Sequence, residues 1–416
     1  MAQSPLSTTS SSVDPDRNFI IPLIILTTLF FMWGFLTSLN DVLIPYFKRL
    51  FDLNYTQALL IQFCFFAAYG VCSIPSGAAV RKIGYQKGAV VGLCIAAAGC
   101  FIFVAAASQT SYNLFLGALF ILAAGITLLQ VSANPYVALL GPSASAPRRL
   151  TMTQTFNSLG AYAGPKLGGP IILGSLATAT VITADAVKAP YLYLGISLVV
   201  LAVFFLLVKL PKVQDEAVEG SYSQTLAHKH LVLGVIAIFV YVGAEVSIGS
   251  LIINYMAEPH IAGMAEEEAS SYVANYWLLA LVGRIAGVFL MFIIPGRVLL
   301  AINALAAVVL LVVVSFASGS PAYYSLIAVG FFNSIMFPTI FSLAVAKLGP
   351  LTSRGSGLLC TAIIGGAFIP LAQGLVADNV SLQISFLVPL VCYLYIAFYG
   401  FKGWKPQLST TTENHS

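Results

Sequence analysis

The sequence predicts an all-α membrane protein with twelve transmembrane helices, and three observations carry this prediction. First, 59% of the 416 residues are apolar and only 8% are charged, against roughly a quarter charged in an ordinary soluble domain. Second, the apolar residues gather in runs of about 20, the length that crosses a bilayer. Third, most connections between these runs are short. The 19 basic and 15 acidic residues are too few to cover a soluble protein of this size, so a water-soluble enzyme, a nucleic-acid binder and a disordered chain are excluded.

Twelve apolar runs are long enough to span a membrane. In chain order they are 19–46, 55–80, 87–107, 112–140, 150–175, 190–210, 230–256, 270–293, 297–317, 321–347, 354–377 and 381–402. The longest polar connection, residues 211–229, separates the sixth run from the seventh. We therefore expect two six-helix bundles joined by a cytoplasmic linker, with a disordered tail before them and a second tail after them: 1–18, 19–210, 211–229, 230–403 and 404–416.

The basic residues predict the orientation of these spans. If both termini are cytoplasmic, 14 of the 19 Lys and Arg residues fall on the cytoplasmic side, three on the other side and two within spans. Cytoplasmic loops are enriched in Lys and Arg. The first run is longer than the core of a signal peptide and has no small-residue cleavage site after it. We therefore expect a multi-pass protein of the inner (plasma) membrane with both termini cytoplasmic.

The sequence contains no catalytic or metal-binding signature in a loop where it could act. The six cysteines all lie within apolar runs and lack the spacing of metal ligands, so we expect free thiols, no metal site and no cofactor. A phosphate loop, a Gly-x-Ser-x-Gly string and a nucleotide fingerprint are all missing from the loops. Neither an enzyme nor an ATP-driven pump is predicted.

Internal repetition indicates two related halves. The string Leu-Gly-Pro that ends at Pro142 recurs at Pro350, 208 residues later. Two acidic residues within predicted spans, Asp41 and Glu245, stand 204 residues apart. Parallel halves with a binding site between them near mid-depth are the expected design of a rocking transporter.

Asp41 and Glu245 are the candidate proton-binding residues, because an ionisable group within a bilayer is costly and marks a functional site. Asp41 has no opposite charge beside it until Lys48 and Arg49. Partial loss of hydration disfavours a charged carboxylate, so protonation near neutral pH becomes possible; the alternative is a carboxylate that simply reaches water at the outer interface. For Glu245, past the middle of span seven, a structural hydrogen bond, substrate binding and a second protonation site all remain open.

Amide side chains form the largest polar group within the spans. Amides both donate and accept hydrogen bonds, which suits a polyol such as a sugar. Gln130 and Asn134 are four residues apart and share one helix face, as do Gln154 and Asn157 at a spacing of three. Three more lie in spans two, eight and ten: Gln62, Asn275 and Asn333. A single amide is equally suited to joining two helices, but four on adjoining helices of one half favour a binding site.

Two basic residues lie within the spans. Arg284, near the cytoplasmic end of span eight, is expected to extend to the membrane interface. Lys166 lies in the outer half of span five at a depth similar to that of Asp41. An Asp41–Lys166 ion pair is therefore a hypothesis, although such a pair would favour the charged carboxylate and oppose easy protonation.

Several segments resemble the fucose–proton symporter family within the major facilitator superfamily. They are FFMWGFLTSLNDVLIPYF, LLQVSANPYVALLGP, TQTFNSLGAYAGP and FPTIFSLAVAKLG, and the resemblance extends from about Phe19 to Trp404. This family includes bacterial transporters of L-fucose, glucose/galactose and N-acetylglucosamine. The resemblance implies the major facilitator fold, two pseudo-symmetric six-helix bundles, and alternating-access transport of a sugar.

The resemblance also implies roles for individual residues. Asp41 corresponds to the family's protonated aspartate, and the amides of span five correspond to Gln154 and Asn157. Trp33, Ser38 and Asn40 share the motif of Asp41. One departure concerns Gln130, which stands where the family usually has an acid before the Ala-Asn-Pro string; glutamine can bind a sugar but cannot titrate. Either Asp41 alone couples to the proton, or Glu245 supplies a second acid from the other half.

The predicted function is import of a hexose-like sugar by proton symport, carried out by a monomer in the lipid bilayer with no nucleic-acid partner. Asp41 and Glu245 are predicted to couple protons. The predicted substrate-binding residues are Trp33, Ser38, Asn40, Gln62, Gln130, Asn134, Gln154, Asn157, Glu245, Asn275 and Asn333. The alternatives are a sodium-coupled sugar symporter, a proton-linked exporter of small molecules and a sugar receptor that does not transport.

Overall fold

The computed structural model describes residues 20–140, 146–178, 183–208, 210–211, 221–348 and 351–406, and over these residues the chain is helical without a strand. The predicted N-terminal tail lies outside the described residues. So do the central part of the predicted linker (212–220), the last part of the C-terminal tail (407–416), and the Gly-Pro pairs of both repeated strings.

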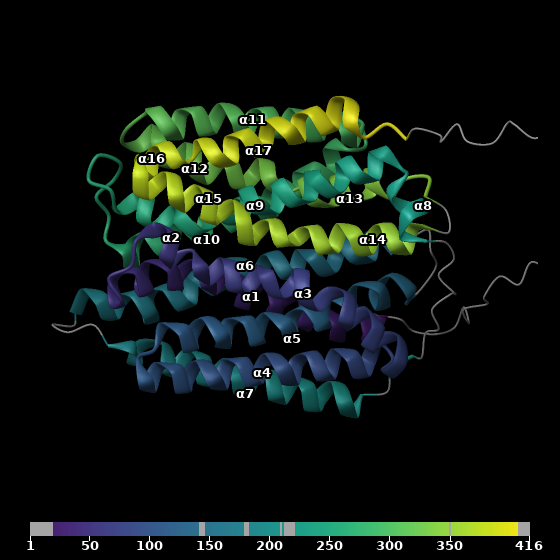
Figure 1. The fold of residues 1–416 in the computed structure, drawn as a ribbon, viewed down its shortest axis with the longest axis horizontal. Coiled ribbons are helices and arrows are strands. Elements are labelled where there is room, and N and C mark those ends of the chain that lie inside the picture. Colours follow the sequence, from purple (N-terminus) through teal and green to yellow (C-terminus); the bar gives the residue numbers. More distant parts are fainter. Residues whose placement is uncertain are drawn as a thin grey trace, which may run out of the picture.

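Six long helices make up the N-terminal half, which occupies the lower part of Figure 1. They are α1 (Ile20–Leu50), α3 (Leu60–Ile83), α4 (Tyr85–Gln109), α5 (Tyr112–Leu139), α6 (Ala146–Thr178) and α7 (Lys188–Leu207). Two short elements join them, α2 (Tyr55–Ala58) before α3 and η2 (Ala184–Val187) before α7. Within this half α4 packs between α5 and α7, α3 packs on α5, and α1 packs on α6.

The C-terminal half, in the upper part of Figure 1, contains three continuous spans and three divided ones. The continuous helices are α9 (Lys229–Ala257), α10 (Glu266–Leu290) and α11 (Gly296–Phe316). The divided spans are α12 (Ser320–Asn333) with α13 (Met336–Ala344); α14 (Thr352–Thr361), η4 (Ala362–Ile364) and α15 (Gly365–Asn379); and α16 (Leu382–Ser385), α17 (Leu387–Phe398) and η5 (Tyr399–Gly403). Between the halves lies the short helix α8 (Tyr222–Leu226).

The predicted fold class is confirmed. Within the described part of the chain, eleven segments are long and apolar enough to cross a membrane. The remaining predicted span, the fifth in chain order, is α6, a helix of 33 residues whose sequence is more polar than that of the other spans. Its amides and two internal prolines lower its mean hydropathy.

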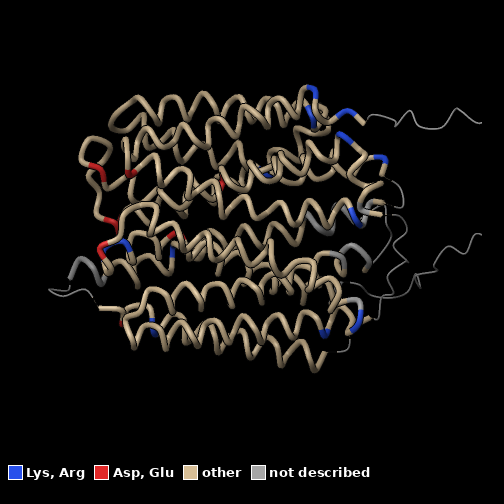
Figure 2. Tube along the Cα trace, in the orientation of Figure 1, with Lys and Arg blue, Asp and Glu red and all other residues tan. Residues whose placement is uncertain are grey.

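Charge is distributed unevenly along the bundle. We call the end where α1 begins and η5 ends the terminal end, and the opposite end, where α2 and α16 lie, the far end (Figure 1). Figure 2 shows most Lys and Arg residues at the terminal end and most Asp and Glu residues at the far end. A bias of this kind is what the positive-inside rule describes.

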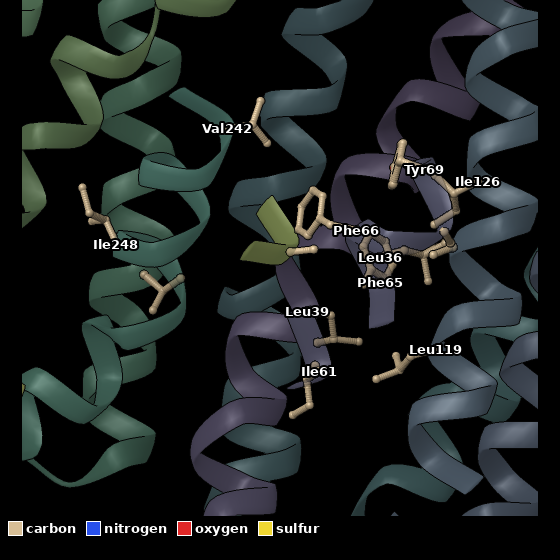
Figure 3. Packing of buried hydrophobic residues seen from close by; sticks show 14 of the residues in the cluster. Leu36, Leu39, Ile61, Phe65, Phe66, Tyr69, Leu119, Ile126, Val242 and Ile248 are labelled. Carbon is tan, nitrogen blue, oxygen red and sulfur yellow. The ribbon is translucent and has the colours of Figure 1, made fainter. Parts of the chain in front are cut away.

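The N-terminal half is packed around large apolar side chains and close helix contacts. In Figure 3, Leu39 of α1 faces Leu119 of α5, and Tyr69 of α3 lies next to Ile126 of α5. Helices α1 and α6 touch through glycines, since a Cβ atom added at Gly160 would lie 2.1 Å from the Phe31 carbonyl oxygen. Small residues allow this approach, which membrane helices use in place of a hydrophobic driving force.

Candidate functional site

Asp41 lies at a contact between the two halves. Its side chain on α1 is only 4% exposed. The Oδ1 atom accepts a hydrogen bond from Gln62 Nε2 of α3 at 3.1 Å and from Ser250 Oγ of α9 at 3.4 Å. Gln62 Nε2 also donates to Ser250 Oγ at 2.8 Å. We refer to Asp41, Gln62 and Ser250 as the Asp41 cluster; it joins the N-terminal half to the C-terminal half through one carboxyl oxygen.

The Asp41 cluster has unused hydrogen-bonding capacity. Among the described residues, no partner is present for Asp41 Oδ2, for Gln62 Oε1 or for Nδ2 of the neighbouring Asn40, although all three atoms are buried. The indole N–H of Trp277 on α10 approaches the Asp41 carboxyl without reaching hydrogen-bond geometry. A buried polar group without a partner costs about 1–3 kcal/mol. Two acceptors and two donors are thus available here to a polar ligand.

No cation pairs with Asp41 among the described residues. The ion pairs there join Arg49 to Glu266 and Lys188 to Asp185, with a longer contact between His260 and Glu258. Lys166 is exposed on α6. The hypothesis of an Asp41–Lys166 ion pair is therefore wrong, because a buried carboxyl and an exposed ammonium face different surroundings.

A second group of polar residues lies within the N-terminal half. Gln130 Nε2 of α5 donates to the Tyr69 hydroxyl of α3 at 2.6 Å. The Trp33 indole of α1 also contacts this hydroxyl. Asn134, one turn after Gln130, is half-buried, and its Oδ1 has no partner among the described residues. The structure therefore brings two of the predicted binding residues, Gln130 and Trp33, together at a tyrosine, and Asn134 follows one turn after Gln130.

The amides of span five have different surroundings. Gln154 is half-buried on α6. Asn157 turns towards α1, where its Nδ2 donates to the Phe30 carbonyl at 3.1 Å. Ser38 lies in the same α1–α6 contact, because a Cβ added at Gly164 would be 2.3 Å from its hydroxyl oxygen. Asn157 thus bonds α6 to α1, and Ser38 packs in the same contact while its hydroxyl donates to the Phe35 carbonyl of its own helix.

Two predicted substrate ligands, Asn333 and Asn275, have surroundings unlike those of Asp41. Asn333 is fully buried, and both ends of its amide are occupied: Nδ2 donates to the Tyr276 hydroxyl at 2.7 Å, and Oδ1 accepts from the Tyr393 hydroxyl at 2.7 Å. Asn275 is exposed on α10, on the face that also carries exposed Leu278 and Val282. The Asn333 amide is thus engaged by two tyrosines, and the role of both residues as substrate ligands stays a prediction.

Glu245 is half-buried on α9, one helical turn after Tyr241. The Tyr241 hydroxyl lies 2.8 Å from Glu245 Oε1 and 3.0 Å from the Asn333 carbonyl oxygen. The sequence left open whether Glu245 makes a structural hydrogen bond, binds substrate or is protonated. The bond to Tyr241 is present, and it does not exclude a protonation role.

Arg284 does not extend to the membrane interface, so that expectation is wrong. Its Nη1 donates to the Gln154 carbonyl oxygen at 3.0 Å and to Ser158 Oγ at 2.7 Å, both on α6. Its Nε donates to the Ser334 carbonyl oxygen at 3.3 Å. The guanidinium therefore connects the two halves, and the Ser334 carbonyl is available to it because Pro338, four residues later, has no N–H.

Sequence reasoning missed several members of these groups. They are Ser250, Tyr241 and Trp277, because a hydroxyl or an indole within an apolar helix carries no spacing signal. Ser250 acquires significance only because the packing of α9 on α1 brings it to Asp41.

Comparisons with known proteins agree with this architecture. Residues 25–363 match the model of the Major Facilitator Superfamily. The chain is 51% identical over 409 residues to a glucose/galactose transporter of Brucella abortus, covering 97% of this chain and 98% of that protein. It is 34% identical over 428 residues to the L-fucose-proton symporter of Escherichia coli (strain K12), covering 96% and 97%.

A crystal structure of a variant of the E. coli Fucose:proton symporter, FucP, has the same fold. It matches with a TM-score of 0.71 and 33% sequence identity over 92% of this chain and 98% of that one. The resemblance read from the sequence motifs is thereby confirmed. With most of its length matched by the family model, and with two paired helical bundles, this chain belongs to the Major Facilitator Superfamily.

Proposed function

We propose that this protein imports a hexose by proton symport, with alternating access of the two halves to a site between them. Sugar transport is supported by the relatives, which are named as glucose/galactose transporters and L-fucose-proton symporters. Proton coupling is supported by the buried Asp41 carboxyl, which bonds to both halves and has no paired cation among the described residues.

The position of Asp41 supplies the coupling mechanism. An unpaired carboxylate in this position carries a large desolvation cost, which protonation removes. Closure of the halves around Asp41 therefore requires a neutral carboxyl, and opening to water allows the proton to leave. The state in which the halves are closed around a charged Asp41 without sugar is disfavoured. The proton and the sugar are therefore expected to cross the membrane together.

The sugar would use the polar atoms that the protein leaves unpaired. Asn40 Nδ2 offers a donor, whereas Gln62 Oε1 and Asp41 Oδ2 offer acceptors. Further polar groups of the same half are the amides Gln130 and Asn134 of α5 and Gln154 of α6. The Trp33 ring of α1 offers an apolar face. A hexose hydroxyl both donates and accepts, so a ring with several hydroxyls matches this mixed set better than an apolar drug does.

The orientation we propose places the terminal end in the cytoplasm of the inner (plasma) membrane and the far end outside. It is supported by the Lys and Arg residues at the terminal end (Figure 2). We also propose that the functional unit is a monomer with bundles at 19–210 and 230–403. Moving one charge through about 100 mV supplies about 2.3 kcal/mol, enough for a sugar gradient of roughly fifty-fold at 1.4 kcal/mol per tenfold.

The decisive experiment measures uptake of labelled D-glucose, D-galactose and L-fucose into proteoliposomes under an imposed pH gradient. Asp41→Asn is expected to abolish accumulation against a gradient while sugar exchange continues. Asp52→Asn, the same change at an exposed position, is the control and should accumulate sugar normally. Accumulation by Asp41→Asn at the control rate would overturn the proposed coupling.

The same preparation separates the alternatives. A sodium-coupled symporter would accumulate sugar under a sodium gradient at constant pH. A proton-linked exporter is an antiporter, so it would accumulate the labelled compound inside the vesicle when the interior is acidic relative to the outside, whereas a symporter would expel the compound under that gradient. A receptor would show sugar-dependent thermal stabilisation without any flux.

A further inference from the structure

Span ten is interrupted where α12 ends at Asn333 and α13 begins at Met336. Pro338 explains the position of this break. In a continuous helix the N–H of residue 338 would bond the carbonyl of Ser334, but proline has no N–H and its ring collides with that carbonyl. The carbonyls before Pro338 therefore need other donors.

Side chains from three neighbouring helices supply these donors. The carbonyl of Phe332 accepts from Asn303 Nδ2 of α11 at 3.1 Å. The next carbonyl, of Asn333, accepts from the Tyr241 hydroxyl of α9 at 3.0 Å. The third, of Ser334, accepts from Arg284 Nε of α10 at 3.3 Å. We call these three carbonyls the span-ten break.

One of these donors is shared with an ionisable residue. The Tyr241 hydroxyl lies within hydrogen-bond distance of both the Asn333 carbonyl and Glu245 Oε1. A hydroxyl carries a single proton. When Glu245 is ionised, its carboxylate is the stronger acceptor, so the Tyr241 hydroxyl donates its hydrogen bond to Glu245 and the Asn333 carbonyl loses its donor. When Glu245 is protonated, it donates to the Tyr241 oxygen, and Tyr241 donates to Asn333.

We propose that Glu245, Tyr241 and the Asn333 carbonyl form a proton-dependent switch that tightens or loosens the span-ten break. Tyr241 is the positioning residue, because it converts the protonation of Glu245 into a hydrogen bond on the backbone. This inference rests on the proposed function of proton-coupled transport, and it concerns Glu245, which the sequence predicts as a second proton-coupling residue. The only covalent change is the binding or release of one proton by the Glu245 carboxyl. The hydrogen bonds of Tyr241 rearrange in response.

The span-ten break also connects to the other half. Arg284, bound to the Ser334 carbonyl, donates to Gln154 and Ser158 of α6. A change in backbone geometry at residues 333–334 therefore reaches the contact between α10 and α6. This path gives Glu245 a way to influence the rocking of the halves without touching Asp41.

Few groups near Glu245 can compete with it as the titrating residue. Those that face it are Tyr241 of α9, Tyr276 and Arg284 of α10, Tyr393 of α17 and Asp41 of α1. Tyrosine and arginine side chains ordinarily change charge only above about pH 10. The two carboxyls are Asp41 and Glu245. Asp41→Asn removes the titration of Asp41, so the remaining response to pH in this range reports Glu245.

The test is amide hydrogen exchange of residues 330–342 in the full protein, read by mass spectrometry and corrected for the intrinsic pH effect. It is carried out at about pH 4 and about pH 8, because a glutamate carboxyl with the ordinary pKa of about 4.3 is mostly protonated at the first pH and ionised at the second. In the Asp41→Asn background, exchange of this segment should rise by about fivefold at the higher pH, the effect expected of one lost hydrogen bond.

Two variants and a matched control make the test specific. Glu245→Gln, whose amide can donate to Tyr241 permanently, should keep exchange slow at both pH values. Tyr241→Phe should give fast exchange at both. Tyr255→Phe removes a buried hydroxyl on the same helix that donates to the Val314 carbonyl, and it should retain the pH response.

The proposal is overturned if Tyr241→Phe or Glu245→Gln keeps the pH response of the parent protein. Because exchange is measured without sugar or flux, this outcome is independent of whether the protein accumulates sugar. A failed uptake experiment would contradict the proposed function. A pH response of hydrogen exchange that is unchanged in Tyr241→Phe or Glu245→Gln would contradict the switch alone.

Discussion

Asp378 accepts two hydrogen bonds from Thr56 across the far end of the bundle, from the backbone N–H at 2.9 Å and from the hydroxyl at 2.6 Å. Its other oxygen accepts from the Tyr55 N–H at 2.8 Å. Asp378 lies in the last turn of α15, whereas Thr56 lies in α2, so this carboxylate joins the two halves. The first N–H groups of a helix lack partners within the helix, and Asp378 provides them from the opposite half.

Replacing Asp378 by alanine should favour separation of the halves at the far end. Hydrogen bonds to a charged group contribute about 1.5–3 kcal/mol each when buried, but this carboxylate is exposed, so we expect a population shift of about threefold to tenfold. Spin labels attached at the exposed positions Ser108 and Asn379 should show a larger population of the longer label-to-label distance, measured by double electron–electron resonance. An unchanged distribution would show that Asp378 does not hold the far end closed.

The Arg49–Glu266 ion pair should behave differently from an ordinary surface pair. Arg49 Nε lies 2.9 Å from Glu266 Oε1, but the Arg49 side chain is 51% exposed and that of Glu266 only 9%. Arg49→Gln leaves a buried carboxylate uncompensated, which costs more than the net value of the pair. The single variant should therefore lower the thermal unfolding temperature, and the double variant Arg49→Gln with Glu266→Gln should recover most of that loss. Failure of the double variant to recover would show that charge compensation is not the reason for the pair.

Lys166→Ala should leave the pH dependence of sugar uptake unchanged. Lys166 is exposed on α6 and forms no ion pair among those described for this chain. Its removal therefore changes neither the hydrogen bonds nor the charge around Asp41. Initial uptake rates between about pH 5 and pH 8, compared with those of the unmodified protein, provide the measurement; a displaced profile would restore a coupling role for this lysine.

The architecture was readable from the sequence because it depends on composition and length. Runs of about 20 apolar residues have few solutions in a bilayer other than helices, and the fold class, together with the resemblance, is confirmed. The divided spans were not predicted, since Pro338 stops a helix only in combination with donors such as Asn303 and Arg284 that arrive from other helices.

The site was readable only in part. Asp41 and Gln62 could be selected because a charge or an amide within lipid requires a reason, and the structure brings both together. The amides Asn275 and Asn333 satisfied the same criterion, yet one faces outward and the other is bound by tyrosines. A residue's type indicates that it needs a partner, but only the rotation of its helix decides whether that partner is a ligand or a neighbouring side chain.

The close contact of α1 and α6 predicts a large effect from a very small substitution. A Cβ at Gly160 would lie 2.1 Å from the Phe31 carbonyl oxygen, which belongs to the backbone and cannot move aside alone. Gly160→Ala should therefore push the two helices apart and destabilise the protein by about 1–3 kcal/mol, the usual effect of overpacking. Since α1 carries Asp41, uptake should also fall.

Gly117→Ala is the matched control, because a Cβ at this exposed position of α5 meets nothing within 4 Å. Alanine is a better helix former than glycine by about 1 kcal/mol in water, so this variant should be at least as stable as the parent. Thermal unfolding of both purified variants in the same detergent gives the comparison. Equal unfolding temperatures for Gly160→Ala and Gly117→Ala would mean that α1 and α6 are not held in contact by their glycines, and that the position of Asp41 depends on other packing.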